Sequence, residues 1–344
     1  MWFASFSFSS SQGPGSNRCD TLTFKSVGSA PEKGPCGMNA FITIMLDIIL
    51  PVFVLIGIGA ALQRKFSLDL YTLAKINIYF LVPGIIFVKL YEAKLSWDVF
   101  QQVFIFFALF IVSLYVFSLL ASLLFHYNKS MKVAFSNSVL FYNSGNYGVP
   151  VNDLVFRHDP FALSIQILIL TFQNILTFSY GIFVLKAING GKLKAALGYF
   201  KMPVLYAVLF GVGLNVTNIQ LPAFIETPAQ YSADAMIAIA LLTLGAQMAQ
   251  LRFSEHLFSV YASVFIRLVC GPVIAFSLVL LLHLDGVVAQ ALIISSAMPT
   301  SVNSSIIAQE YENEPAFATQ AVIFSTLLSS VTVSATIYFV RILF

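Results

Sequence analysis

The chain has 344 residues, of which 58% are hydrophobic and 10% are charged, and its net charge is +3. A soluble domain carries about 25% charged residues, so this composition excludes a water-soluble fold, and the small net charge gives no indication of nucleic-acid binding. Residues 99–125, 161–185 and 316–340 contain no Asp, Glu, Lys or Arg. Each run exceeds the ~20 residues of a membrane-spanning helix, and none alternates as a barrel strand does. The sequence therefore predicts an all-α polytopic membrane protein, in contact with membrane lipid.

Residues 1–37 differ from the rest of the chain. They are rich in Ser, Gly and Pro and contain no apolar run of signal-peptide length. We expect them to form a disordered tail. Because Met38 directly precedes the first apolar segment, our hypothesis is that translation naturally starts there and that the upstream residues are dispensable or misassigned.

Charged, Gly and Pro clusters divide the remaining chain into ten predicted transmembrane helices. These spans cover residues 42–63, 70–90, 98–125, 132–156, 161–188, 201–219, 230–250, 256–283, 287–309 and 315–343. The loops after odd-numbered spans hold Arg64, Lys65, Lys129, Lys132, Lys192, Lys194, Lys201 and Arg252, whereas those after even-numbered spans hold Lys89, Lys94 and Arg157. Cytoplasmic loops are enriched in Lys and Arg. We therefore predict a multi-pass protein of the cell (inner) membrane with both termini outside.

The two halves of the chain repeat one another. The first span carries Pro51-Val52 and then a Gly-x-Gly run, and the sixth carries Pro203-Val204 and then a Gly-x-Gly run. The fifth and tenth spans each begin at an acid–Pro pair, which suits the first turn of a helix. Because a repeat of five spans inverts its second copy, the pattern predicts inverted repeats, which are typical of secondary transporters. The predicted units are a first repeat at 38–188, a cytoplasmic linker at 189–200 and a second repeat at 201–344.

The fourth span contains helix-breaking residues where its hydropathy requires a membrane helix. It reads NSGNYGVP from Asn143 to Pro150, and the ninth span reads SSAMPTSVNSS from Ser295 to Ser305. Pro removes a backbone donor, Gly lowers helix stability and unpaired amides in hydrocarbon are costly. We predict that both helices are broken and that their freed backbone groups, including an exposed half-helix N-terminus, face one polar site near the midplane. The alternative is that these small and polar residues only pack helices together.

The candidate substrate-binding residues come from the two breaks and from one intramembrane cation. They are Asn143, Gly145, Asn146, Pro150, Pro299, Ser301, Asn303 and Arg267. Asn137, Gln173, Asn174 and Gln247 are further mid-span polar residues that would line the path. Arg267 has two interpretations. It either faces the cavity, as a positive charge for an anionic substrate or as the partner of a carboxylate, or reaches the cytoplasmic interface with its long side chain.

Enzyme signatures are absent from the sequence. It contains no HExxH, GxSxG or GxxxxGK motif. Cys19, Cys36 and Cys270 form neither a disulfide framework nor a CxxC pair. We expect no enzyme activity, no metal and no cofactor.

The motif from Asn143 to Pro150, the proline of the ninth span, the LGAQMA run at 244–249 and the segment from Arg267 to Pro272 together resemble the auxin efflux carrier family. The likeness covers residues 38–344 and is to short bacterial permeases that lack the long central loop of the plant proteins. It implies two inverted five-helix repeats, with a scaffold of spans 1, 2, 6 and 7 and a moving transport domain of spans 3–5 and 8–10. The broken spans 4 and 9 would cross at their prolines.

The same resemblance implies the function. It indicates a secondary transporter that moves a small organic anion, such as a carboxylate or dicarboxylate, by alternating access, and a homodimer formed through the scaffold helices. Two alternatives remain open at this point, a sodium-coupled carrier similar to the bile-acid symporters and a membrane-bound sensory or binding protein without flux.

Overall fold

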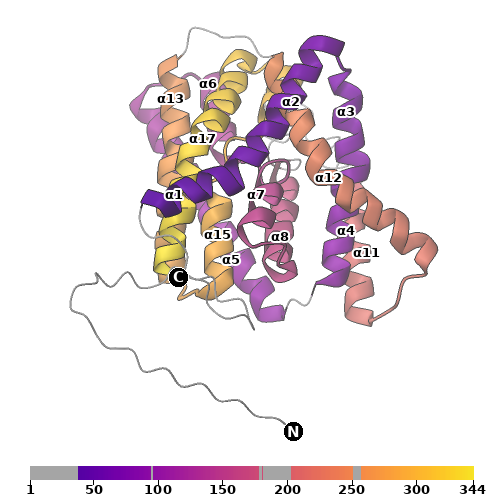
Figure 1. The fold of residues 1–344 in the computed structure, drawn as a ribbon. Helices are drawn as coiled ribbons and strands as arrows, with labels where there is room; N and C mark the ends of the chain where they lie inside the picture. Colours follow the sequence, from indigo (N-terminus) through magenta and orange to yellow (C-terminus); the bar gives the residue numbers. More distant parts are fainter. Residues whose placement is uncertain (1–37, 94–95, 178–179, 181–202, 251–256) are drawn as a thin grey trace, which may run out of the picture.

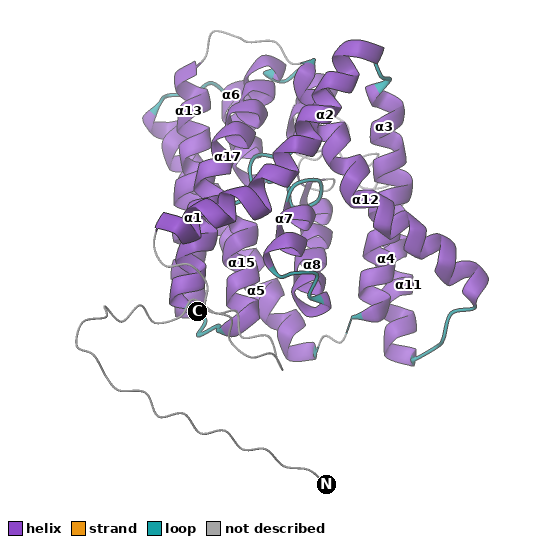
Figure 2. Ribbon diagram, viewed as in Figure 1, coloured by secondary structure: helices purple, strands orange, loops and turns teal. Residues whose placement is uncertain are grey.

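A computed structural model describes residues 38–93, 96–177, 180, 203–250 and 257–344. The predicted tail at 1–37 and linker at 189–200 lie outside the described residues. Within them the chain is built of helices (Figure 2), and the described residues form no strand beyond one isolated bridge between Tyr142 and Thr300. This confirms the all-α fold class.

Within the described residues, six continuous helical segments are long and apolar enough to cross a membrane, namely Ala40–Phe66, Leu70–Glu92, Trp97–Leu124, Ala223–Ala249, Leu257–Leu281 and Pro315–Leu343. The first contains α1 (Met38–Ile44), η1 (Met45–Ile49) and α2 (Leu50–Phe66), and the second contains α3 (Leu70–Ile76), η2 (Asn77–Leu81) and α4 (Val82–Glu92). The others are α5 (Trp97–Leu124), α12 (Ala223–Ala249), the run of α13 (Leu257–Phe265), η4 (Ile266–Cys270) and α14 (Gly271–Leu281), and α17 (Pro315–Leu343). Shorter helices are α6 (Lys129–Leu140), α7 (Gly148–Val155), α8 (Pro160–Leu176), α11 (Pro203–Thr217), α15 (Gly286–Ser296) and α16 (Val302–Glu310).

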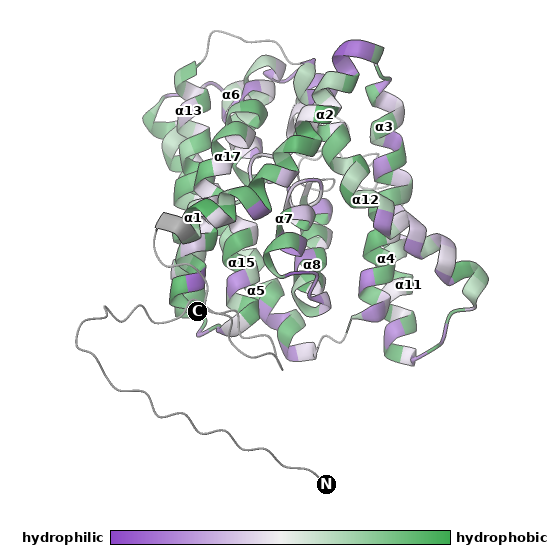
Figure 3. Cartoon of the chain, viewed as in Figure 1, coloured by the Kyte–Doolittle hydropathy of each residue, from purple (hydrophilic) through white to green (hydrophobic). Residues whose placement is uncertain are grey.

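Most of the length of these helices is hydrophobic (Figure 3). Helix α5 exposes Val112, Leu120 and Leu124 while it buries Phe110 and Leu114. A helix that is hydrophobic on both faces belongs in lipid rather than in water. The fold is therefore that of a multi-pass membrane protein.

Three prolines widen the helices in which they lie. The π-helical segments η1, η2 and η4 end two residues before Pro51, Pro83 and Pro272. Pro offers no amide and clashes with the preceding turn, and a π turn absorbs that defect without ending the helix. Two polar side chains in hydrocarbon, Asn77 and Arg267, belong to these widened turns.

Glycines bring the backbones of α2 and α12 into direct contact. A Cβ on Gly59 would lie 2.1 Å from the carbonyl oxygen of Leu242, and one on Gly245 would lie 1.9 Å from that of Ile56. Such approach is how membrane helices associate through small residues. Figure 1 shows α3, α4, α11 and α12 gathered on one side of the molecule, whereas α5, α13, α15 and α17 lie on the other.

The acid–Pro pairs behave differently in the two halves. The carboxylate of Asp159 accepts a 2.7 Å hydrogen bond from the Phe161 amide and caps α8, as the sequence indicated. Glu314 adopts a left-handed backbone conformation, with φ at 49°, and its side chain does not cap α17. The repeated sequence pattern thus yields a side-chain cap only at α8.

Both predicted helix breaks are present. Helix α6 ends at Leu140 and α7 begins at Gly148, and α15 ends at Ser296 before α16 begins at Val302. The two breaks, at 141–147 and 297–301, appear as loops in the interior of the helical body (Figure 2).

The two broken segments cross through a short antiparallel bridge. The amide of Asn143 donates to the carbonyl of Pro299, and the amide of Ser301 donates to the carbonyl of Phe141, each across 2.7 Å. The crossing therefore involves Pro299 but not Pro150, contrary to the expectation that both prolines meet there. Pro150 is the third residue of α7. The amide at this position has no hydrogen-bond partner within the helix, so Pro150 fits the first turn of α7 and does not interrupt a helix.

Candidate functional site

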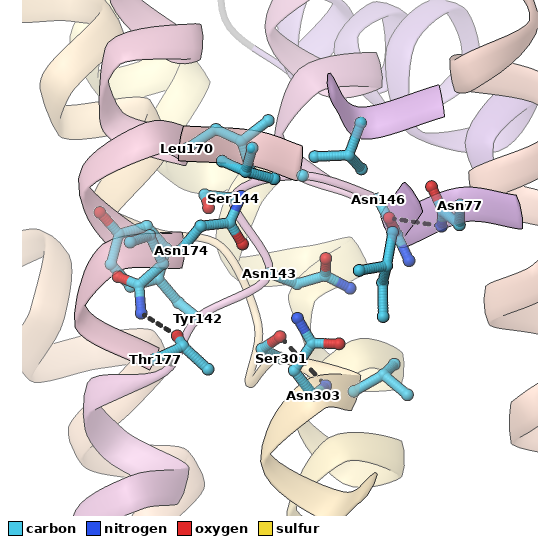
Figure 4. Close-up of a pocket in the computed structure, with 16 residues that line it drawn as sticks. Asn77, Tyr142, Asn143, Ser144, Asn146, Leu170, Asn174, Thr177, Ser301 and Asn303 are labelled. Carbon is cyan, nitrogen blue, oxygen red and sulfur yellow. Dashed lines mark hydrogen bonds between the residues drawn. The ribbon is translucent and has the colours of Figure 1, made fainter. Parts of the chain in front are cut away.

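A polar cavity of about 50 Å³ lies beside the crossing (Figure 4). The first break contributes Tyr142, Asn143, Ser144, Gly145 and Asn146, and the second contributes Ser301 with Val302 and Asn303 of α16. Around them stand Leu170, Gln173 and Asn174 of α8 with Thr177, and Asn77, Ile78, Val82 and Val204 from η2, α4 and α11. Figure 4 shows the side chains of Asn143 and Asn303 turned toward the same space.

Most of the residues proposed from the sequence come together here. Asn143, Gly145, Asn146, Ser301 and Asn303 line the cavity, as do the further candidates Gln173 and Asn174. Residues more than 150 positions apart in the chain are thus brought to one place by the crossing.

Five of the proposed residues lie outside the cavity, namely Arg267, Pro150, Pro299, Asn137 and Gln247. Pro150 is in the first turn of α7, and Pro299 uses its carbonyl to accept the bond from Asn143. Asn137 is buried within α6, and Gln247 belongs to the last turn of α12. None of the four lines the cavity.

Arg267 fits neither of its two sequence interpretations. Its side chain is 0% exposed, so it does not reach the membrane interface, and it does not line the cavity. Its guanidinium stacks against the ring of Tyr142, whose centroid lies 4.8 Å away, and Tyr142 is part of the cavity wall. Tyr142 therefore separates Arg267 from the cavity.

The sequence analysis missed Asn77, Tyr142, Ser144 and Thr177. Asn77 is 4% exposed, and its side-chain amide donates to the Asn146 side chain across 3.1 Å. The available signal was an Asn within an apolar run, six residues before Pro83. Tyr142 and Ser144 flank residues that were selected, and Thr177 follows Asn174 by three residues, about one helical turn.

The carbonyls that the first break frees are all used. A helix leaves its last four carbonyls without partners inside the helix. In α6 these carbonyls accept hydrogen bonds from the Phe141 amide to Asn137, from the Thr300 hydroxyl to Ser138, from the Arg267 guanidinium to Val139 and from the Gln173 side chain to Leu140. The break therefore exposes no backbone acceptor of α6 to the cavity.

The half-helix N-termini are capped as well, which corrects the expectation of an exposed amide cluster. The amide of Gly148 donates to the carbonyl of Asn143 across 2.9 Å, and that of Val149 donates to Gly145 across 3.1 Å. In α16 the amide of Asn303 donates to the Ser301 hydroxyl across 3.2 Å. These bonds form because the loop folds back on the helix that follows it.

Two buried side chains fix the shape of the first broken segment. Gln166 donates to the carbonyl of Ser144 and accepts from the Asn152 amide, each across 2.7 Å. A Cβ on Gly148 would lie 2.6 Å from the Gln166 nitrogen, so the glycine leaves room for this network. The loop is therefore held by side chains of α7 and α8.

The side chains of the cavity retain unused hydrogen-bonding capacity. The amide nitrogens of Asn143 and Asn174 and the amide oxygens of Asn77 and Gln173 are buried and have no hydrogen-bond partner. Buried polar groups of native proteins are nearly always satisfied, and each one left unpaired costs about 1–3 kcal/mol. These two donors and two acceptors all belong to residues that line the cavity.

The charge of the site is neutral. None of the described residues that line the cavity is Asp, Glu, Lys, Arg or His. In the part of the chain that the structure describes, no group of three or more His, Cys, Asp or Glu could hold a metal ion. The polar side-chain groups that line the cavity are therefore amides and hydroxyls.

Comparison with known proteins decides the family. The family model described as membrane transport protein matches residues 43–337, which include every residue of the cavity. The chain belongs to the membrane transport protein family. It is similar to auxin efflux carrier component 1 of Arabidopsis thaliana, with 28% identity over 134 residues that make up 37% of this chain and 21% of that protein. The match thus covers about a fifth of the relative's length.

Membership in the membrane transport protein family confirms the resemblance to auxin efflux carriers and the assignment as a transporter rather than an enzyme. It also gives the cavity a context. In secondary transporters, substrate sites are typically formed by discontinuous helices. Non-helical backbone at membrane depth is tolerated only where it is buried in protein or lines a cavity.

Proposed function

We propose that this member of the membrane transport protein family is a permease that moves a small organic anion, such as a carboxylate or dicarboxylate, across the cell membrane by alternating access. The observation that carries the proposal is the set of unpaired amides in the cavity. A carboxylate would accept from the nitrogens of Asn143 and Asn174, and a hydroxyl or water at the other end would donate to Asn77 and Gln173. Amides both donate and accept, so a neutral site can bind an anion without an ion pair.

The size of the cavity supports a small substrate. A cavity needs at least ~10–15 Å³ to hold one water molecule. A cavity of about 50 Å³ therefore holds roughly three to five water-sized groups. That space suits a short carboxylate, and an elongated or aromatic acid would require the cavity to widen.

The proposed architecture is ten spans arranged as two inverted five-helix repeats. The positions of the two helix breaks support it, because one break lies in each half of the chain, at 141–147 and at 297–301. Paired interruptions at corresponding places in two halves are typical of inverted-repeat transporters.

Helix packing gives a second support for the repeat. Gly59 follows Pro51 at the same interval as Gly211 follows Pro203. Gly59 abuts a carbonyl of α12, and a Cβ on Gly211 would lie 3.0 Å from the Phe87 carbonyl of α4. Helices α2 and α11 thus meet their neighbours at equivalent positions.

In the proposed cycle, α2, α4, α11 and α12 form a scaffold and the helices of the crossing move against it. The cavity lies between the two groups. Asn77 and Val204 line it from the scaffold side, and the polar residues of the two breaks, α8 and α16 line it from the crossing side. We further propose that both termini face the outside, as the distribution of Lys and Arg indicates, and that scaffold helices mediate a homodimer.

Flux measurements test the function. The purified full-length protein would be placed in liposomes, and uptake of labelled malonate would be followed with and without unlabelled malonate inside. Saturable uptake that accelerates when the inside is loaded is the result expected of a carrier. Binding without any uptake would identify a sensory or binding protein instead, and uptake that needs a sodium gradient would identify a sodium-coupled carrier.

A further inference from the structure

Among the described residues, Arg267 is the largest side chain that is completely buried, and it lies against Tyr142 of the first break. One guanidinium nitrogen donates to the carbonyl of Val139 across 3.0 Å, and another donates to the carbonyl of Ser296. The guanidinium also faces the rings of Phe110 and Tyr142, with centroids at 5.4 and 4.8 Å. Its polar contacts are therefore backbone carbonyls and its remaining contacts are aromatic faces.

Both of these carbonyls belong to the C-terminal ends of half-helices. Val139 lies in the last turn of α6, and Ser296 is the last residue of α15. The C-terminus of a helix carries about half a negative charge, so two such ends together offset the charge of one guanidinium. This balance accounts for a buried Arg that pairs with no described Asp or Glu.

The planar fork of Arg is needed for this arrangement, because it presents several donors in fixed directions. Gly271 leaves the necessary space, since a Cβ there would lie 2.9 Å from the guanidinium nitrogen and 3.3 Å from the Ser296 carbonyl. The widened turn η4 contains Arg267 and ends next to Gly271. The charge of Arg267, the geometry of its donors and the space beside Gly271 thus all favour its contact with the two carbonyls.

We propose that Arg267 is a positioning residue that fastens the ends of α6 and α15 to each other, so that the two broken segments behave as one unit. The residues that follow these ends carry the bridge bonds of Asn143 and Ser301 and line the cavity. Loss of the guanidinium leaves two carbonyl ends unpaired and one uncompensated negative charge beneath the crossing. This role is expected in the protein without substrate, so its test does not depend on the identity of the transported molecule.

Hydrogen exchange of the full-length protein in lipid nanodiscs tests this role. Arg267→Gln should accelerate exchange of the amides of Asn143 and Ser301 by about tenfold or more, because hydrogen bonds to a charged group are lost at both half-helix ends. Arg267→Lys keeps the charge but loses the fork, so it should give an intermediate rate. Gly271→Ala keeps the Arg and displaces it, and it should accelerate exchange at the same two segments.

Asn215 provides a matched control. Its side chain also donates to two backbone carbonyls at the end of a helix, those of Tyr91 at 2.6 Å and Ala93 at 2.8 Å. None of these three residues lines the cavity. Asn215→Ala should leave exchange at both broken segments unchanged. Unchanged exchange at the crossing in Arg267→Gln and Gly271→Ala overturns the proposal, as does an increase that is equally large in α2 and α12.

Discussion

The side chain of Asn77 donates to the side chain of Asn146 across 3.1 Å and so links the widened turn η2 to the first broken segment. Asn77 lies on the scaffold side of the cavity and Asn146 on the crossing side. If these two sides move against each other, this bond breaks and re-forms in each cycle.

A double-mutant cycle measures this link. Asn77→Ala and Asn146→Ala should each lower the free energy of unfolding, and the double variant should lose less than the sum, with a coupling of about 1 kcal/mol. Thermal unfolding of the variants in detergent gives the values. Strict additivity would show that the two amides do not interact.

Gln166 should be essential for the shape of the first broken segment. Gln166→Leu keeps the volume but removes the bonds to Ser144 and Asn152, leaving buried partners unpaired, so unfolding should become easier by about 1–3 kcal/mol. Ser113→Ala is the control, because its hydroxyl bonds only to the preceding turn of its own exposed helix face. Equal melting temperatures of Gln166→Leu and the control would remove Gln166 from this role.

Two glycines of α2 should respond in opposite ways to the same substitution. Gly59→Ala places a methyl group against the carbonyl of Leu242, whereas nothing lies within 4 Å of a Cβ on Gly57. The first change should therefore destabilise the protein, and the second should stabilise it by up to about 1 kcal/mol through helix propensity. Similar effects of the two substitutions on the melting temperature would contradict the close approach of α2 and α12.

The orientation can be tested by labelling. The stretch Gly190–Leu193 lies outside the described residues, and the sequence predicts that it is cytoplasmic. In a variant whose native Cys19, Cys36 and Cys270 are replaced by Ser, a single cysteine introduced there should resist an impermeant thiol reagent on intact cells, whereas a single cysteine added after Phe344 should react. The reverse pattern would invert the proposed topology.

The sequence predicted the helix breaks because they depend on local chemistry. Asn143, Gly145 and the nearby prolines are unfavourable in a membrane helix wherever the rest of the chain lies. The crossing point could not be found in the same way. Which carbonyl accepts from Asn143 is decided by a segment of the other half of the chain, and Pro150 and Pro299 look alike until that contact is known.

Arg267 shows a second limit of sequence reasoning. Hydropathy places the residue at a depth in the membrane but does not name its neighbours, so the sequence interpretations assumed that the charge must meet water, a ligand or a carboxylate. The structure instead pairs it with two helix ends. Asn77 was missed for the same reason. A lone Asn in an apolar run can be assigned to the cavity only when its hydrogen bond to the Asn146 side chain is known.

Uptake of labelled malonate by liposomes containing Asn143→Leu tests the central claim most directly. The substitution removes an unpaired donor from the cavity at nearly constant volume, and loss of such a bond costs about 1–3 kcal/mol, or roughly ten- to hundredfold in affinity. Asn137→Leu is the matched control, since Asn137 is also buried with an unpaired side-chain oxygen but lies outside the cavity. We predict that Asn143→Leu inserts normally and loses uptake while Asn137→Leu retains it. Uptake by Asn143→Leu equal to that of the parent would contradict the assignment of this cavity as the substrate site.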